Sequence, residues 1–247
     1  MHDHSRIDRR MLLKFLCLAP GAGVGWLTAA GARTDRDVKG ELERWSRGGA
    51  FLPRWRTTDG PACSPTERDV QGPFYVAGAP GRARIAGPDE PGDRIVVRGT
   101  VLSADCKTPV ANALVDVWQA DAEGRYHEAE DDYRLRGVVR TDARGGYVFE
   151  TIAPGRYRID ENAGSLRPAH IHFTVASARH RPLTTQLYFK GDPYLAPNDA
   201  CGDACGSDDP GRIVEATRES RDGTGFSATF NIVLAALSAE PGEDSRT

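Results

Sequence analysis

The stretch RIVVRGTVLSADCKTPVANALVDVWQAD, residues 94–121, decides the fold expected for this 247-residue chain. Two runs rich in valine, isoleucine and leucine are separated by a segment with turn-forming residues. Short runs of β-branched residues that end at turn residues are typical of strands. The stretch therefore predicts two neighbouring β-strands.

Five later runs have the same character, and turn residues such as those at 142–146 and 153–155 separate them. The runs are GGYVFETI (145–152), GRYRIDE (155–161), HIHFTVAS (170–177), TTQLYFKG (184–191) and FSATFNIVL (226–234). Seven short strands with little helix predict an all-β protein, a β-sandwich with long loops. Residues 190–223 lack periodicity, so we expect a surface excursion packed over the sandwich.

The length allows one well-filled domain with a small appendage. We predict an export signal at 1–32, a short helix and linker at 33–60, the β-sandwich domain at 61–240 and a tail at 241–247. The short N-terminal helical segment is expected at residues 37–45.

The first 32 residues have the order of an export signal. Arg9 and Arg10 precede an apolar run that leads to Ala30-Gly31-Ala32, and adjacent arginines are typical of the twin-arginine type. A membrane anchor is the competing interpretation, but Pro20 and several glycines interrupt the run. We expect cleavage near Ala32, a periplasmic or secreted protein, and no membrane association after the signal is removed.

Charge argues against a nucleic-acid partner. Removing residues 1–32 leaves 28 basic and 33 acidic side chains, a net charge of −5, and no basic stripe remains.

Four cysteines remain after Cys17 leaves with the signal, and they allow three pairings. Export favours disulfides. We favour Cys63 with Cys106 and Cys201 with Cys205, although sequence alone does not settle the connectivity. A zinc site is the rival, but the C-x-x-x-C motif supplies only two thiolates where structural zinc takes four ligands.

The sequence RPAHIHF (167–173) places two histidines one residue apart in a predicted strand. Side chains alternate along a strand, so His170 and His172 share one face and Ile171 lies on the other. A half-exposed strand would fit the pair alone, so a metal site needs partners. Tyr126 and Tyr157 each follow a glycine-containing turn. Two phenolates with two imidazoles suit Fe(III).

The chain resembles the intradiol ring-cleavage dioxygenases, which include catechol 1,2-dioxygenases and protocatechuate 3,4-dioxygenases. The motifs are GPFYVAGAP (72–80), VDVWQADAEGRY, LRGVVRTDARGGYVF, IAPGRY, RPAHIHF and LTTQLYFKGDPYL (183–195). The resemblance implies that Tyr126, Tyr157, His170 and His172 are Fe(III) ligands. It also implies that Arg167 is the active-site arginine, that Gln186 is near the substrate and that Phe74 is near the bound ring.

By the same resemblance, the reaction is cleavage of an aromatic diol with O2 between the hydroxyl-bearing carbons, to a cis,cis-muconate type product. Tyr157 would be the ligand that the diol displaces, and Arg167 would stabilise charge on the ring. The substrate stays open among catechol, protocatechuate and hydroxyquinol. A homo-oligomer, a dimer, is implied, although the segment before GPFY is shorter than the helical segment used for dimerisation in catechol 1,2-dioxygenases.

A second interpretation is a non-catalytic binding module of the transthyretin-like or carboxypeptidase-regulatory-like kind. Residues 99–118 and 141–159 fit that pattern unaided. The four predicted ligands discriminate, because a binding module has no reason to keep them together.

Overall fold

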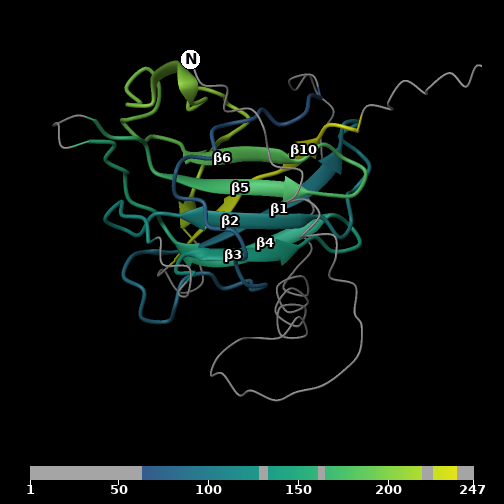
Figure 1. Ribbon diagram of the computed structural model, residues 1–247, viewed down its shortest axis with the longest axis horizontal. Helices are drawn as coiled ribbons and strands as arrows, with labels where there is room; N and C mark the ends of the chain where they lie inside the picture. Colours follow the sequence, from purple (N-terminus) through teal and green to yellow (C-terminus); the bar gives the residue numbers. More distant parts are fainter. Residues whose placement is uncertain (1–62, 128–132, 161–164, 219–224, 238–247) are drawn as a thin grey trace, which may run out of the picture. The chain divides into compact units, whose positions relative to one another are not determined.

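The computed structural model describes residues 63–127, 133–160, 165–218 and 225–237 (Figure 1). The predicted export signal, the predicted short helix at 37–45 and its linker lie outside the described residues. In the described part of the chain, no helix has the length and apolar character needed to cross a membrane.

Two five-stranded sheets make up the fold, which confirms the predicted all-β sandwich. Sheet I has the order β3 (Arg136–Arg140), β2 (Leu114–Gln119), β5 (His170–Ala176), β6 (Leu183–Phe189) and β7 (Ile213–Val214). In sheet II, β1 (Arg94–Ser103) pairs with β4 (Gly146–Ile152), β9 (Gly225–Thr229) and β10 (Ile232–Leu234), and β8 (Thr217–Arg218) pairs with β9. Figure 1 shows β6, β5, β2 and β3 side by side. A short 3₁₀ turn, η1 (Gly202–Ala204), lies in the aperiodic stretch after β6.

The hydrophobic core lies between the two sheets. Phe173 of β5 packs against Phe149 of β4 and against Phe230, with ring centroids 6.0 and 5.2 Å apart. Ile171, Phe173 and Val175 are fully buried in this core, each contributing about 1.5–3 kcal/mol by burial. Because these odd-numbered residues of β5 face the core, His170 and His172 lie on the outer face of sheet I.

Two strand predictions were wrong in detail, and three strands were missed. Residues 155–160 form no strand, although Arg158 makes an isolated bridge with Leu166 and backbone hydrogen bonds join Tyr157 and Ile159 to residues 165–167. The stretch is largely exposed, so it lacks the buried face of a strand in the core. The run at 226–234 splits into β9 and β10, where the Asn231 side chain accepts the Thr100 N–H (2.9 Å) in place of a backbone carbonyl. Strands β3, β7 and β8 were not predicted.

Residues 66–75 cover part of the outer face and the free edge of sheet I. The Asp69 N–H donates to the Thr184 carbonyl (2.9 Å) at the edge of β6, and the Gln186 side-chain amide donates to the Val70 carbonyl (2.7 Å). Farther along, the Tyr75 hydroxyl donates to Asp116 of β2 (2.8 Å). This cover removes the outer face of β5 from water.

Both favoured disulfides are present in the structure. Cys63–Cys106, with Cα atoms 6.0 Å apart, anchors the chain just before the covering segment. Cys201–Cys205 closes a small loop in the aperiodic stretch after β6. The aperiodic stretch after β6 is more than a surface excursion, because Asp199 and Arg212 within it are about 95% buried or more.

Candidate functional site

Three polar atoms of different side chains converge on the outer face of β5. The Nε2 atoms of His170 and His172 are 3.2 Å apart, and the Tyr126 hydroxyl lies 3.1 Å from each of them. Both histidines are almost fully buried. The strand fixes the two imidazoles, while Tyr126 comes from the loop after β2.

The outer nitrogens of the histidines have different surroundings. His170 Nδ1 lies 2.7 Å from the Pro168 carbonyl, which accepts only if Nδ1 carries the proton, so the Nε2 lone pair points at the cluster. His172 Nδ1 is buried and has no hydrogen-bond partner among the described residues, and the Trp118 ring stacks on the imidazole with ring centroids 4.7 Å apart. Burial lowers the pKa of His170 to about 3, with Arg167 adding to the shift. Burial also lowers the pKa of His172 well below its usual value, so both imidazoles are neutral near pH 7.

The cluster fits a bound cation. A neutral imidazole nitrogen binds a metal through its lone pair. Distances of 3.1–3.2 Å between the Tyr126 oxygen and the two Nε2 atoms suit metal–ligand distances of about 2.0–2.2 Å. Burial raises the pKa of the Tyr126 hydroxyl, so this phenol ionises near pH 7 only beside a cation. In the described part of the chain, no three His, Cys, Asp or Glu side chains gather at metal-binding spacing. Tyrosine oxygen would therefore have to complete the ligand set.

The loops that carry Tyr126 and Tyr157 pack against each other through glycines. Gly124 has φ +82°, and a Cβ there would lie 2.0 Å from the Arg156 carbonyl oxygen. Asp121 joins the loops, because its carbonyl accepts the N–H groups of Gly124 (3.0 Å) and Gly155 (2.8 Å). Its carboxylate lies 3.0 Å from His127 Nε2, next to Tyr126. Close backbone contact thus sets the spacing of the two tyrosines.

Phe74 and Tyr157 lie beside Tyr126. The Phe74 ring stacks on Tyr126 with centroids 4.4 Å apart and meets Tyr157 edge-on at 5.2 Å. The rings of Tyr126 and Tyr157 are 5.5 Å apart. These three predicted site residues therefore form one aromatic group next to the two histidines.

Arg167 and Gln186 form a second polar group on the same face of sheet I. Gln186 stands opposite His172 in the β5–β6 ladder, and its Oε1 accepts from Arg167 Nη2 (3.0 Å). Arg167 also donates to the Tyr188 hydroxyl (3.0 Å) and to Asp199 (3.2 Å). Both ends of the Gln186 amide are thus bound to protein groups, so its visible task is to hold Arg167.

Sequence reasoning missed Trp118, Tyr188 and Asp199. Trp118 shares a face with His172 because it lies opposite that residue in the β2–β5 ladder, a register that VDVWQ alone does not reveal. Tyr188 is two residues after Gln186 in β6, so strand alternation could have placed it on the same face. Asp199 lies in the aperiodic stretch after β6, where no motif or periodic pattern pointed to it.

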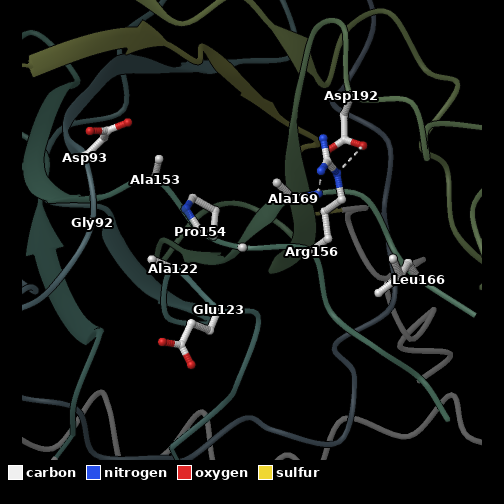
Figure 2. A pocket seen from close by; sticks show the side chains of 11 residues that line it. Gly92, Asp93, Ala122, Glu123, Ala153, Pro154, Arg156, Leu166, Ala169 and Asp192 are labelled. Atoms are coloured by element: carbon white, nitrogen blue, oxygen red, sulfur yellow. Dashed lines mark hydrogen bonds and ion pairs between the residues drawn. The ribbon is translucent and has the colours of Figure 1, made fainter. Parts of the chain in front are cut away.

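A hollow of about 850 Å³ lies beside the two tyrosine loops (Figure 2). Figure 2 shows the carboxylates of Asp93 and Glu123 on its wall and the Arg156 guanidinium bound to Asp192, at 3.1 Å. None of the seven predicted site residues lines it. We assign no function to this hollow.

Comparison with known proteins gives consistent matches. The sequence profile of the Dioxygenase family (Dioxygenase_C) matches residues 70–236. Catechol 1,2-dioxygenase 2 of Acinetobacter lwoffii is 42% identical over 147 residues, which are 53% of each chain. The protocatechuate 3,4-dioxygenase beta chain of Burkholderia cepacia is 41% identical over 165 residues, 62% of this chain and 68% of the relative. The chain spans about half the length of the first curated relatives that it matches.

A solved structure has a similar fold. The dioxygenase domain of a dioxygenase carbohydrate-binding protein fusion from Streptomyces sp. SirexAA-E aligns with a TM-score of 0.58 and 31% identity, over 70% of this chain and all of that one. Fold and site thus define a β-sandwich protein with a buried histidine and tyrosine cluster on the outer face of one sheet. The chain belongs to the intradiol dioxygenase family.

Proposed function

We propose that this chain is a non-haem Fe(III) intradiol dioxygenase. It would cleave a catechol-type aromatic diol with O2 between the hydroxyl-bearing carbons and give a cis,cis-muconate type product. One observation carries the proposal: the Tyr126 hydroxyl and the Nε2 atoms of His170 and His172 lie 3.1–3.2 Å from one another in a buried cluster. The family membership supports the same reaction class.

The proposed iron ligands are Tyr126, Tyr157, His170 and His172. When bound, Fe(III) would supply a Lewis acid that favours phenolate and diolate oxygen. The strand holds the imidazoles, and the glycine contact between the loops holds the phenols side by side. The Tyr157 oxygen would take a proton from the incoming diol, acting as a general base.

Arg167 is the proposed stabiliser of negative charge on the ring. This residue is 95% buried and its guanidinium is fixed by Gln186, Tyr188 and Asp199, so no reorganisation is needed when charge develops. Phe74 would meet the ring of the substrate beside Tyr126. Because the face is covered by residues 66–75, the charge of Arg167 acts in a site that is poor in water.

The proposal is tested on the purified full-length protein by metal analysis, visible spectroscopy and O2 uptake. We expect iron, a burgundy to red colour from tyrosinate-to-Fe(III) charge transfer, and a band shift when catechol is added. O2 uptake with catechol, protocatechuate and hydroxyquinol would then identify the substrate. A colourless protein that contains zinc and takes up no O2 would overturn the proposal. The same result would revive the binding-module interpretation, which no feature of the site favours.

We also propose export by the twin-arginine route to the periplasm or the exterior. Arg9 and Arg10 before the apolar run support this, and so do two disulfides, which persist in oxidising compartments. Changing Arg9→Lys together with Arg10→Lys should retain the activity inside the cell. Unaltered periplasmic activity of that variant would count against the route.

The proposed partners are a small aromatic diol and O2, with a homodimer as the assembly. The resemblance to catechol 1,2-dioxygenases is the support for the dimer. Light scattering of the purified protein during size exclusion should give twice the chain mass, and a single chain mass would refute the dimer.

A further inference from the structure

A loop at residues 199–206, which contains the Cys201–Cys205 disulfide, supplies a buried partner to Arg167. Asp199, whose side chain is 1% exposed, accepts from Arg167 Nε (3.2 Å) and Nη2 (3.4 Å). The same carboxylate accepts the N–H of Cys201 (2.9 Å), and the next residue, Ala200, donates its N–H to the Leu166 carbonyl (3.1 Å). The loop is therefore bound both to the guanidinium and to the backbone beside it.

The far end of the loop reaches Arg167 by a second route. The Gly206 N–H, directly after Cys205, donates to Asp69 Oδ2 (3.3 Å), and that oxygen also accepts the Tyr188 hydroxyl (2.7 Å). Tyr188 in turn accepts from Arg167. Arg212 pairs with the same Asp69 at 2.5 Å and fills the space where a Cβ of Gly206 would lie. The Cys201–Cys205 disulfide thus joins the two ends of a closed set of contacts around Arg167.

These contacts decide where a buried positive charge stays. A guanidinium inside a protein needs an opposite charge and hydrogen-bond acceptors, because leaving it unpaired is costly. Asp199 is the carboxylate that binds Arg167 directly, and Asp69 is shared with Arg212 and Tyr188. Without Asp199, the guanidinium would turn toward Asp69 or toward water and leave its place.

We propose that Asp199 is a positioning residue for Arg167, and that the Cys201–Cys205 disulfide holds Asp199 in place, making the loop a redox-sensitive clamp. The proposal rests on the proposed function, in which Arg167 stabilises charge on the substrate. A dithiol would open the clamp by passing two electrons and two protons to the disulfide. Cys201 and Cys205 become thiols, and the dithiol becomes a cyclic disulfide. Cys201 is the partly exposed half of the bond, and Cys205 is buried.

The first test compares Asp199→Asn and Asp199→Ala with the control Asp203→Asn. Asp203 is in the same loop but exposed, so its change should leave kcat at the wild-type value. We expect kcat to fall on the order of 10–100-fold in Asp199→Ala, with iron content, KM and the coloured catechol complex little changed. Asparagine keeps the acceptor without the charge, so Asp199→Asn should lie between the two. A wild-type kcat in Asp199→Ala would overturn the proposal.

The second test needs no substitution at Asp199 and so avoids a variant that fails to fold. The native protein is treated with dithiothreitol, the thiols are alkylated, and mass mapping shows which bond opened. The double change Cys63→Ser and Cys106→Ser is the matched background, because it removes the other disulfide of the described residues. Reduction should lower kcat on the order of 10-fold or more without loss of iron.

The two tests are then combined as a cycle. If the disulfide acts through Asp199, reduction should have little further effect on kcat in Asp199→Ala. If reduction lowers kcat by the same factor in Asp199→Ala as in the wild-type protein, the disulfide does not act through Asp199, and the proposal is overturned.

A readout that needs no activity separates this proposal from the proposed function. The Arg167 Nε–H, bound to Asp199, should give a slowly exchanging proton resonance in the oxidised protein and lose this protection on reduction. If the wild-type protein holds no iron and cleaves no diol, the proposed function fails, while the resonance still decides the positioning. Equal protection in both redox states would overturn the clamp.

Discussion

Two groups of polar side chains share the outer face of sheet I and differ in how their atoms are satisfied. In the Tyr126, His170 and His172 cluster, three atoms face one another, and within the described part of the chain His172 Nδ1 has no partner. Around Arg167, the Nε and Nη2 groups donate to Asp199, Gln186 and Tyr188. The first group keeps its lone pairs for a ligand, whereas the second uses protein groups to fix a charge.

The difference teaches how burial can serve opposite purposes. Burial keeps the imidazoles neutral, which is the form that binds a metal. For Arg167 the neighbouring tyrosine and carboxylates raise the pKa although burial alone would lower it, so the guanidinium stays charged. One buried face therefore contains uncharged ligands and a permanent cation a short distance apart.

The largest expected effect is from His172→Ala. Loss of one imidazole on the strand face cannot be replaced by Ile171, which points into the core, so the protein should purify without stoichiometric iron and without colour. The control is His180→Ala, since His180 hydrogen-bonds Ser103 outside the cluster. Metal analysis and the visible spectrum decide the matter. A coloured, iron-loaded His172→Ala protein would end the assignment of this ligand.

Arg167→Ala should separate the two groups. If this side chain acts on charge that develops during the reaction, turnover should fall by about 10²–10³-fold while iron and the coloured catecholate complex persist. Arg144→Ala, in the exposed turn before β4, serves as the charge-matched control. Steady-state kinetics and metal analysis are compared for both. A variant that has lost its iron, or one with the full cleavage rate, would show that the residue has another role.

Gly124→Ala tests the junction that sets the spacing of the tyrosines. A side chain at φ +82° with its Cβ 2.0 Å from a carbonyl oxygen must push the loops apart, so unfolding free energy should fall by roughly 2–4 kcal/mol. Iron should also be held less tightly. Denaturant unfolding of the metal-free protein measures the first effect. Gly87→Ala is the control, because a Cβ there meets nothing within 4 Å.

The smallest effect concerns Asp116, under the Tyr75 hydroxyl. Burial raises its pKa from 3.8 to about 7, so the folded state binds an extra proton between these values. The stability from this group is complete below pH about 4 and is lost as pH rises from about 4 to about 7. Asp116→Asn should flatten that part of the unfolding profile. Identical profiles would contradict the assignment.

Asp105→Asn is the control, because Asp105 changes the stability with pH in the opposite direction to Asp116. Hydrogen bonds from Thr108 lower the pKa of Asp105 to about 2, so its contribution is present above pH about 4 and is lost only in stronger acid.

The sequence predicted the sandwich and the shared face of His170 and His172, because alternation along a strand is a local property. It failed for residues 155–160, whose alternation resembles a strand but which are largely exposed and, in the described part of the chain, make an isolated bridge to Leu166 in place of a ladder. Trp118, Tyr188 and Asp199 were missed because their neighbours are set by ladder register and by a loop far along the chain. The disulfides were predictable in part, since the proposed export would favour disulfides for four cysteines.

The covering segment at residues 66–75 has a consequence for how the protein folds. Its contacts span long stretches of chain: Val70 meets Gln186 across 116 residues, and Thr66 meets Val233 across 167. Closing such long loops costs entropy before any contact is gained, so these contacts belong to the late, slow steps of folding. A nascent chain that ends before β6 holds both histidines but lacks the buried environment that keeps them neutral. The proposed metal site would become competent only when both ends of the domain have met, and metal content would then be a measure of completed folding.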